Sequence, residues 1–239
     1  MSFAHRFARH LVQTPRGQAY VLREMANAKG VDQTTAFVSA RETLVDGELG
    51  AMLVEHAETQ SRYIEELNAH AAELRVQTDP APAHLSYVAV LDRALGGYFS
   101  DSLSSNSEIA EAYLLRLVCE ERALSQYRAY ANVFSVVGQT EIAFTLQRMV
   151  RENERHLRSM HAVAQRFTPS RVMLAATLSH WRRFEARVFG EVERATVRFA
   201  VVRGITPLPG FLRESWLAMM RVGDWLHLDS PSGYGNVAF

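Results

Sequence analysis

Apolar residues recur at the spacing of an α-helix along most of this chain, and this pattern limits the possible fold more than any other feature. Residues three, four, seven or eleven positions apart share one face of a helix, whereas a strand alternates with a period of two. From about residue 33 onward, no useful length of sequence shows that alternation. The sequence therefore predicts an all-α fold.

Breaks rich in glycine, proline and serine divide the pattern into separate helices. We expect these helices at residues 18–28, 33–45, 48–76, 84–102, 107–137, 140–167, 170–203 and 211–226. Gly138 lies between two of the longest and has the position of a C-cap glycine. Because long helices joined by short connections pack as antiparallel neighbours, we predict a four-helix bundle.

The predicted bundle core covers residues 33–167, and residues 168–239 form additional C-terminal helices that pack on it. Trp181, Trp216 and Trp225 belong to this extension, and we expect them to be buried against the bundle or against a partner subunit. We interpret the whole chain, residues 1–239, as a single helical domain, since this length is enough to bury a large core.

Composition excludes several classes of protein. The 26 acidic and 26 basic residues balance, so no overall charge attracts the chain to nucleic acid. No apolar run approaches the roughly 20 residues of a membrane span, and the N-terminal residues lack an apolar stretch of signal-peptide length. Cys119 is the only cysteine, which rules out an internal disulfide. We expect a cytoplasmic protein without nucleic-acid or membrane partners.

Polar residues interrupt the apolar stripes of three long helices near their midpoints. His56 lies on the stripe of 48–76, Glu120 on that of 107–137 and His156 on that of 140–167, with Glu152 one turn before it. A buried carboxylate is costly unless it is paired, protonated or bound to a cation. Since imidazoles and carboxylates inside a bundle are ligands for non-haem iron, manganese or zinc, we predict a metal site at these four residues.

The alternative for each residue is structural. His56 could be a core or interface histidine, and Glu152 and His156 could simply stack one turn apart on a helix face. Glu120 could form a buried ion pair with an arginine of the next helix, such as Arg148 or Arg155.

Three segments carry a family resemblance: EHAETQSRYIEEL at 55–67, CEERALSQYRAY at 119–130 and RENERHL at 151–157. They resemble helices of the ferritin-like superfamily, of the YciE/YciF and rubrerythrin-like kinds, over about residues 33–167. The resemblance implies a four-helix bundle that holds mononuclear or dinuclear iron and uses O₂ to oxidise a small substrate.

The ligand motifs depart from the family pattern at three positions. Thr59 and Ala123 stand where the family has ligands, and Asn153 stands where the last Glu-x-x-His motif needs its glutamate. The positions that match are Glu120 and His156, with His56 and Glu152 as plausible supplements. A complete di-iron set is therefore not implied, which leaves a mononuclear site, an unusual dinuclear site or a bundle without metal.

Two functions follow as hypotheses. One is a ferritin-like non-haem iron oxidoreductase acting on a small molecule, and the other is a metal-free stress or scaffold protein that acts through dimerisation. A homodimer is expected in either case. A haem-oxygenase-like fold is a third possibility, which the short connection at Gly138 makes less favourable.

Overall fold

The computed structural model describes residues 9–28, 47–78, 81–96, 106–168 and 170–206. Within these ranges the chain is helical and contains no strand, which confirms the all-α prediction. The elements are α2 (Pro15–Ala28), α4 (Gly47–Glu73), the 3₁₀ turn η2 (Ala83–Leu85), α5 (Tyr87–Ala94), α6 (Asn106–Val136), α7 (Thr140–Phe167) and α8 (Arg171–Val202). The helices predicted at 33–45 and 211–226 lie outside the described residues.

The four long helices agree closely with the sequence prediction. The α7 helix has the predicted bounds, and the ends of α4, α6 and α8 lie within three residues of theirs. The shorter α2 begins three residues earlier than predicted, at Pro15. Thr14 Oγ1 accepts the N–H of Gly17 at 3.1 Å, and proline is well suited to the first helical position because it has no N–H to satisfy.

The prediction for α5 was wrong in its bounds. Residues 83–85 form a 3₁₀ turn, and the α-helix begins only after Ser86, whose hydroxyl caps it by accepting the N–H of Ala89 at 3.3 Å. The helix ends at Ala94, and Gly96 has a φ of 72°. The rest of the predicted helix, residues 97–102, lies outside the described residues.

Gly138 ends α6 as predicted. Its φ of 80° lies in the left-handed region, which glycine adopts without steric cost. Its N–H donates to the carbonyl of Ser135, and the next N–H, of Gln139, donates to the carbonyl of Phe134 at 2.9 Å. This pair of bonds is a Schellman motif, and it turns the chain directly into α7.

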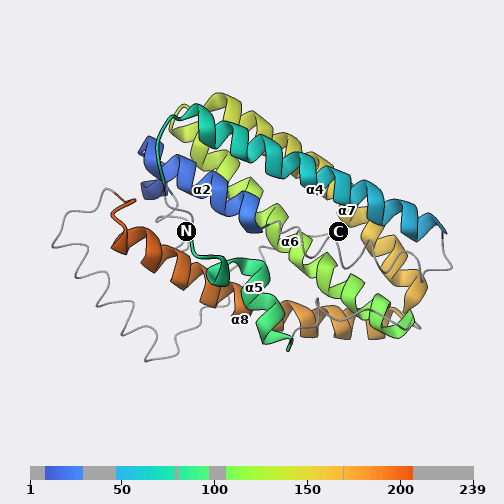
Figure 1. Cartoon of the computed structure of the whole chain (residues 1–239). Coiled ribbons are helices and arrows are strands. Elements are labelled where there is room, and N and C mark those ends of the chain that lie inside the picture. The colour runs from blue at the N-terminus through green and yellow to red at the C-terminus, as the bar shows by residue number, and fades with distance from the viewer. Residues whose placement is uncertain (1–8, 29–46, 79–80, 97–105, 169, 207–239) are drawn as a thin grey trace.

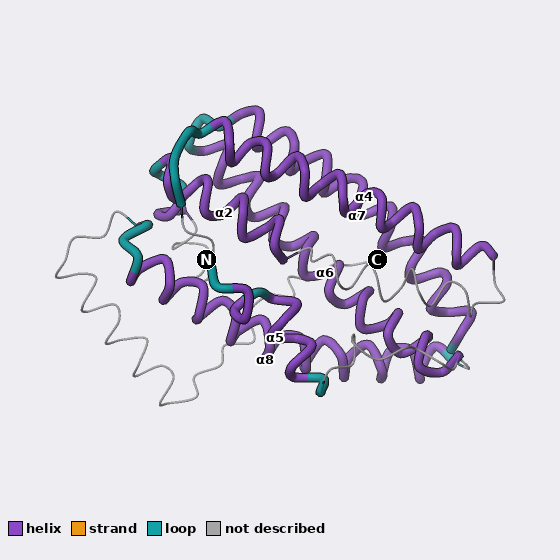
Figure 2. Tube along the Cα trace, in the orientation of Figure 1, coloured by secondary structure: helices purple, strands orange, loops and turns teal. Residues whose placement is uncertain are grey.

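Figures 1 and 2 show how the helices are arranged. The α6 and α7 helices form an antiparallel hairpin, α2 packs antiparallel to α4, and α4 runs in the same direction as α6. The α5 and α8 helices pack on the other side of α6. Trp181 of α8 is buried, as predicted, whereas Trp216 and Trp225 lie outside the described residues.

Two groups of buried side chains make up the core, and α6 contributes to both. One group lies where α2, α4, α6 and α7 meet, and includes Tyr63, Leu67, Phe134 and Met149. The other lies between α5, α6, α7 and α8, and includes Leu91, Leu117 and Trp181. Along α6, Glu120 lies between Cys119 and Leu124 of the second group and is itself buried, so this polar residue is held inside the core.

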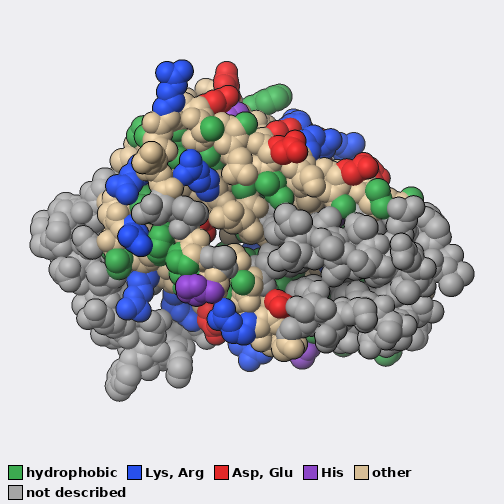
Figure 3. All heavy atoms as spheres, viewed as in Figure 1, with side chains coloured by type: hydrophobic (Ala, Val, Ile, Leu, Met, Phe, Trp, Pro, Cys, Tyr) green, Lys and Arg blue, Asp and Glu red, His purple; other side chains and the backbone are tan. Residues whose placement is uncertain are grey.

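The described surface carries charges of both signs, as Figure 3 shows for one face. No helix in the described ranges is both long and apolar enough to span a membrane.

Candidate functional site

A polar cluster joins α4 to α6 in the protein interior. His56 Nε2 lies 3.2 Å from Glu120 Oε1, and the Gln60 amide nitrogen lies 3.1 Å from the same ring nitrogen. Gln60 also donates to Glu120 Oε1 at 3.3 Å, and all three side chains are buried. Because Nε2 carries a proton in only one neutral tautomer, it either donates to Glu120 or accepts from Gln60.

The α7 helix supplies two more residues to this cluster. The ring of His156 meets that of His56 edge-on, with the centroids 5.1 Å apart at 88°. Burial lowers the pKa of His156. The charges of nearby carboxylates, such as Glu55 and Glu120, act to raise this pKa but do not outweigh the effect of burial. Asn153, which is fully buried, donates to the backbone carbonyl of Glu120 at 3.1 Å. The structure therefore brings His56, Glu120 and His156 together.

Glu152 points to different partners. Its carboxylate accepts a hydrogen bond from the Tyr63 hydroxyl at 2.8 Å and another from Arg62 at 2.9 Å. Burial tends to raise the pKa of Glu152, but the Tyr63 hydrogen bond and the charge of Arg62 outweigh it and lower the pKa. Glu152 is thus held as a carboxylate by residues of α4, while its charge also acts on His156, one turn along α7.

The arrangement of these residues does not fit a metal ion as it stands. Among the described residues, no group of three or more His, Cys, Asp or Glu side chains is placed to hold one. The Gln60 amide lies against both His56 and Glu120, where it acts as a hydrogen-bond donor. Arg116, one turn before Glu120, is buried, and its positive charge interacts with that carboxylate. The described cluster is therefore a hydrogen-bonded network.

The arginines proposed as ion-pair partners of Glu120 have other positions. Arg148 pairs with Glu66 of α4, and the side chain of Arg155 is exposed. The positive charge that acts on Glu120 comes instead from Arg116 on its own helix.

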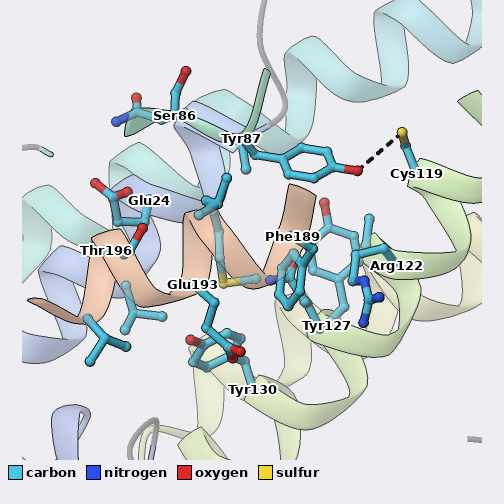
Figure 4. Close-up of a pocket in the computed structure, with 18 of the residues that line it drawn as sticks. Glu24, Ser86, Tyr87, Cys119, Arg122, Tyr127, Tyr130, Phe189, Glu193 and Thr196 are labelled. Carbon is cyan, nitrogen blue, oxygen red and sulfur yellow. Dashed lines mark hydrogen bonds between the residues drawn. The ribbon is translucent and has the colours of Figure 1, made fainter. Parts of the chain in front are cut away.

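A cavity of about 150 Å³ lies next to this cluster, between α2, the start of α5, α6 and α8 (Figure 4). Its walls are mainly aromatic and aliphatic, and Glu120 belongs both to the wall and to the polar cluster. The aromatic lining residues are Tyr20, Tyr87, Tyr127, Tyr130 and Phe189.

A buried ion pair stands at one side of the cavity. Arg122 donates from Nε to Glu185 Oε1 at 3.1 Å and from Nη2 to Oε2 at 3.0 Å, and Glu185 is fully buried. The Arg122 guanidinium also lies 4.3 Å from the centre of the Phe189 ring. The Tyr87 hydroxyl donates to Glu185 at 3.1 Å. Arg122 thus has its charge matched by a carboxylate from α8.

Cys119 lies beside this ion pair, with its sulfur 3.3 Å from the Tyr87 hydroxyl. Burial raises the pKa of the thiol to about 12. A thiol that stays protonated is a poor nucleophile, so Cys119 is a structural residue of the cavity wall.

Two further carboxyl groups, of Glu24 and Glu193, line the cavity. Burial raises the pKa of Glu24, although the N–H of Ala81 donates to it at 3.1 Å and favours the ionised form. Burial also raises the pKa of Glu193, while the charges of Arg122 and Arg194 act to lower it. Carboxyl groups with raised pKa values in a cavity are common at binding and catalytic sites.

The sequence reasoning missed the cavity and the Arg122–Glu185 pair. A signal for Glu185 was present, because it lies on the apolar stripe that includes Leu178, Trp181 and Val188. The cavity itself had no such signal, since its walls come from helices far apart in the sequence.

Comparisons with known proteins add no identification: no family model, no curated protein and no solved structure matches this chain. The ferritin-like resemblance accordingly stays a prediction from the three sequence segments.

Proposed function

We propose that this protein binds a small organic molecule in the cavity between α2, α6 and α8. The observation that supports this most is the combination of mainly apolar walls with a few polar groups that face the same space. This combination is typical of small-molecule sites. An engineered apolar cavity of about 150 Å³ binds benzene, so a cavity of about 150 Å³ suits a compound with a single ring.

Filling the cavity should abolish this binding. Ala123 lines it from α6, and an Ala123→Phe side chain would occupy the space that a ring-sized ligand needs. We expect at least about a tenfold loss of affinity for single-ring compounds, measured by isothermal titration calorimetry. Ala162→Phe is the matched control, because Ala162 is exposed on α7 and should leave affinity unchanged. Equal affinities of the two variants would place the ligand elsewhere.

A non-haem iron oxidoreductase is the second candidate, and the residue types of the polar cluster favour it. Two imidazoles and one carboxylate, from His56, His156 and Glu120, are the ligand set of many non-haem iron oxygenases. In this candidate the cavity beside Glu120 would hold the substrate. These side chains would have to reorient, and Gln60 would have to give up its bonds to His56 and Glu120. Manganese or zinc could use the same residues.

Anaerobic titration with Fe(II) tests this candidate. It predicts one or two equivalents of bound iron and a higher thermal midpoint, because a ligand that binds the native state stabilises it. His156→Ala should remove both effects, whereas Glu152→Gln should change them little, because Glu152 is held by Tyr63 and Arg62. Binding of less than stoichiometric iron by the wild-type protein rules the candidate out, and leaves the cavity proposal standing.

The ferritin-like fold is also part of the proposal. In its favour, α2 pairs with α4 and α6 pairs with α7, while α4 and α6 run in the same direction and are joined by a long connection that contains α5. This order resembles the two helix hairpins and long crossover of ferritin-like bundles. The homodimer, the cytoplasmic location and the metal-free scaffold function remain proposals from the sequence.

A further inference from the structure

We propose that the ligand of this cavity is a small organic cation, a primary amine on a single ring, whose ammonium group lies between Glu24 and Glu193. This inference rests on the proposed small-molecule function of the cavity and specifies its ligand. Three features of the described walls support it: the balance of charge, the aromatic surfaces and the behaviour of the two carboxyl groups.

Among the charged groups of the described wall, two carboxyls face the cavity. The wall contains one basic side chain, Arg122, which is held by Glu185 through two nitrogens and whose charge also acts on Glu193, as does that of Arg194. Glu120 is hydrogen-bonded toward His56, on the side of the polar cluster. Glu24 comes from α2 and Glu193 from α8, so these two carboxyls approach the cavity from different helices (Figure 4). These two carboxylates would repel an anionic ligand, whereas they would attract a cation.

Two tyrosines that line the cavity interact with the same carboxyls. Tyr20 interacts electrostatically with Glu24, and Tyr130 interacts with both Glu24 and Glu193. Ammonium groups bind favourably to the faces of such rings, by about 0.5–2 kcal/mol according to how well water is excluded. The cavity wall already shows this type of contact, since the Arg122 guanidinium lies over the Phe189 ring.

A metal cation suits the site less well than an organic one. Magnesium and calcium require about six or more oxygen ligands in a hydrated or carboxylate-rich environment. The described wall supplies two carboxyls, with mainly apolar and aromatic surface around them. An amine attached to a ring can place its charge at the carboxyls and its ring against the apolar wall.

The proton balance of the two carboxyls gives the proposal a distinctive signature. The groups that act on Glu24 include the Ala81 N–H, Tyr20 and Tyr130, and those that act on Glu193 include Arg122, Arg194 and Tyr130. In the empty cavity burial raises both pKa values above 4.5, so the protonated forms persist to higher pH than in an exposed carboxyl. An ammonium ion stabilises the ionised forms and therefore releases protons when it binds. The affinity of the protein for the ammonium ion should therefore rise as the pH increases from about 4.5 through the raised pKa values of the two carboxyls.

Calorimetry with benzylamine and benzyl alcohol tests the charge requirement directly. The two compounds have nearly the same shape, but only the amine is a cation at pH 7. We expect the amine to bind at least about tenfold more tightly than the alcohol. At pH values near the raised pKa values of the two carboxyls it should also release protons, seen as a heat that depends on the ionisation enthalpy of the buffer. Proton release is measured on the wild-type protein and so does not depend on any variant being folded.

Two variants then locate the ammonium group. Glu193→Gln and Glu24→Gln should each weaken benzylamine binding about tenfold and leave benzyl alcohol binding within about twofold. Glu191→Gln is the matched control, because Glu191 is exposed on the same helix as Glu193. It should change neither affinity.

The outcomes separate this inference from the function on which it rests. Equal binding of amine and alcohol, or amine binding that all three variants leave unchanged, would overturn the cationic ligand and keep a neutral one. Tighter binding of magnesium than of benzylamine would also overturn it. If a panel of single-ring compounds, charged and neutral, fails to bind the wild-type protein, the cavity function is wrong and the inference falls with it.

Discussion

Arg122→Met should lower the free energy of unfolding by about 3–5 kcal/mol, which would be among the largest losses from a single substitution in this protein. Glu185 has no solvent exposure, and Arg122 satisfies both of its carboxylate oxygens. Methionine fills similar volume but leaves the carboxylate without its counter-charge in a medium that solvates it poorly. Urea denaturation followed by circular dichroism measures the change.

Two further variants separate this effect from a general cost of losing an arginine. Arg128 lies on the same helix as Arg122 and forms an exposed ion pair with Glu154 of α7. Arg128→Met should cost at most about 1 kcal/mol. The double variant Arg122→Met/Glu185→Leu removes both charges and should recover most of the lost stability, because apolar replacements of buried pairs are often neutral. A double variant as unstable as Arg122→Met alone would contradict the ion-pair explanation.

Glu120→Ala should lower the free energy of unfolding by about 3 kcal/mol. The substitution removes the hydrogen-bonding partner of His56 and Gln60, and it also removes the negative charge that acts on the buried Arg116. Denaturation in the presence of a chelator measures the contribution of the network alone.

Glu58→Ala is the matched control, since Glu58 is exposed on α4, and it should change stability by no more than about 0.5 kcal/mol. A comparably small effect of Glu120→Ala under chelation would argue against the hydrogen-bonded network. If Fe(II) then stabilised the wild-type protein and not the variant, the iron candidate would gain support.

Glu120 and Arg122 both belong to α6, which contacts other helices on two sides. Glu120 meets His56 of α4 and lies near His156 of α7, while Arg122 binds Glu185 of α8, and both residues line the cavity. The two positions are about 200° apart around a helix, so one element can bind to partners on nearly opposite sides. Changes at either residue would therefore affect the shape of the cavity as well as stability.

Helix formation and burial were predictable from local information. The spacing of apolar residues placed α7 at its observed bounds, and it also identified His56 and Glu120 as buried polar residues. These properties depend on the periodicity of one helix, which a single stretch of sequence contains.

The partners of a side chain at the edge of an apolar helix face were not predictable from periodicity. Glu152 and His156 are one turn apart, yet Glu152 binds Arg62 and Tyr63 whereas the ring of His156 meets His56. The difference depends on which residues of α4 lie opposite each of them. The rotation of α4 against α7 determines that, and periodicity alone carries no information about it.

By itself, the sequence determined that the chain is helical, where most of its long helices begin and end, and which polar residues interrupt their buried faces. The tertiary structure alone decided the partners of those residues and the existence of the cavity. Tyr20 and Thr196 show why: they lie 176 positions apart, and the Tyr20 hydroxyl donates to the Thr196 carbonyl at 3.2 Å. Helical periodicity is a local property, whereas a cavity exists only where separate helices meet and leave space between them.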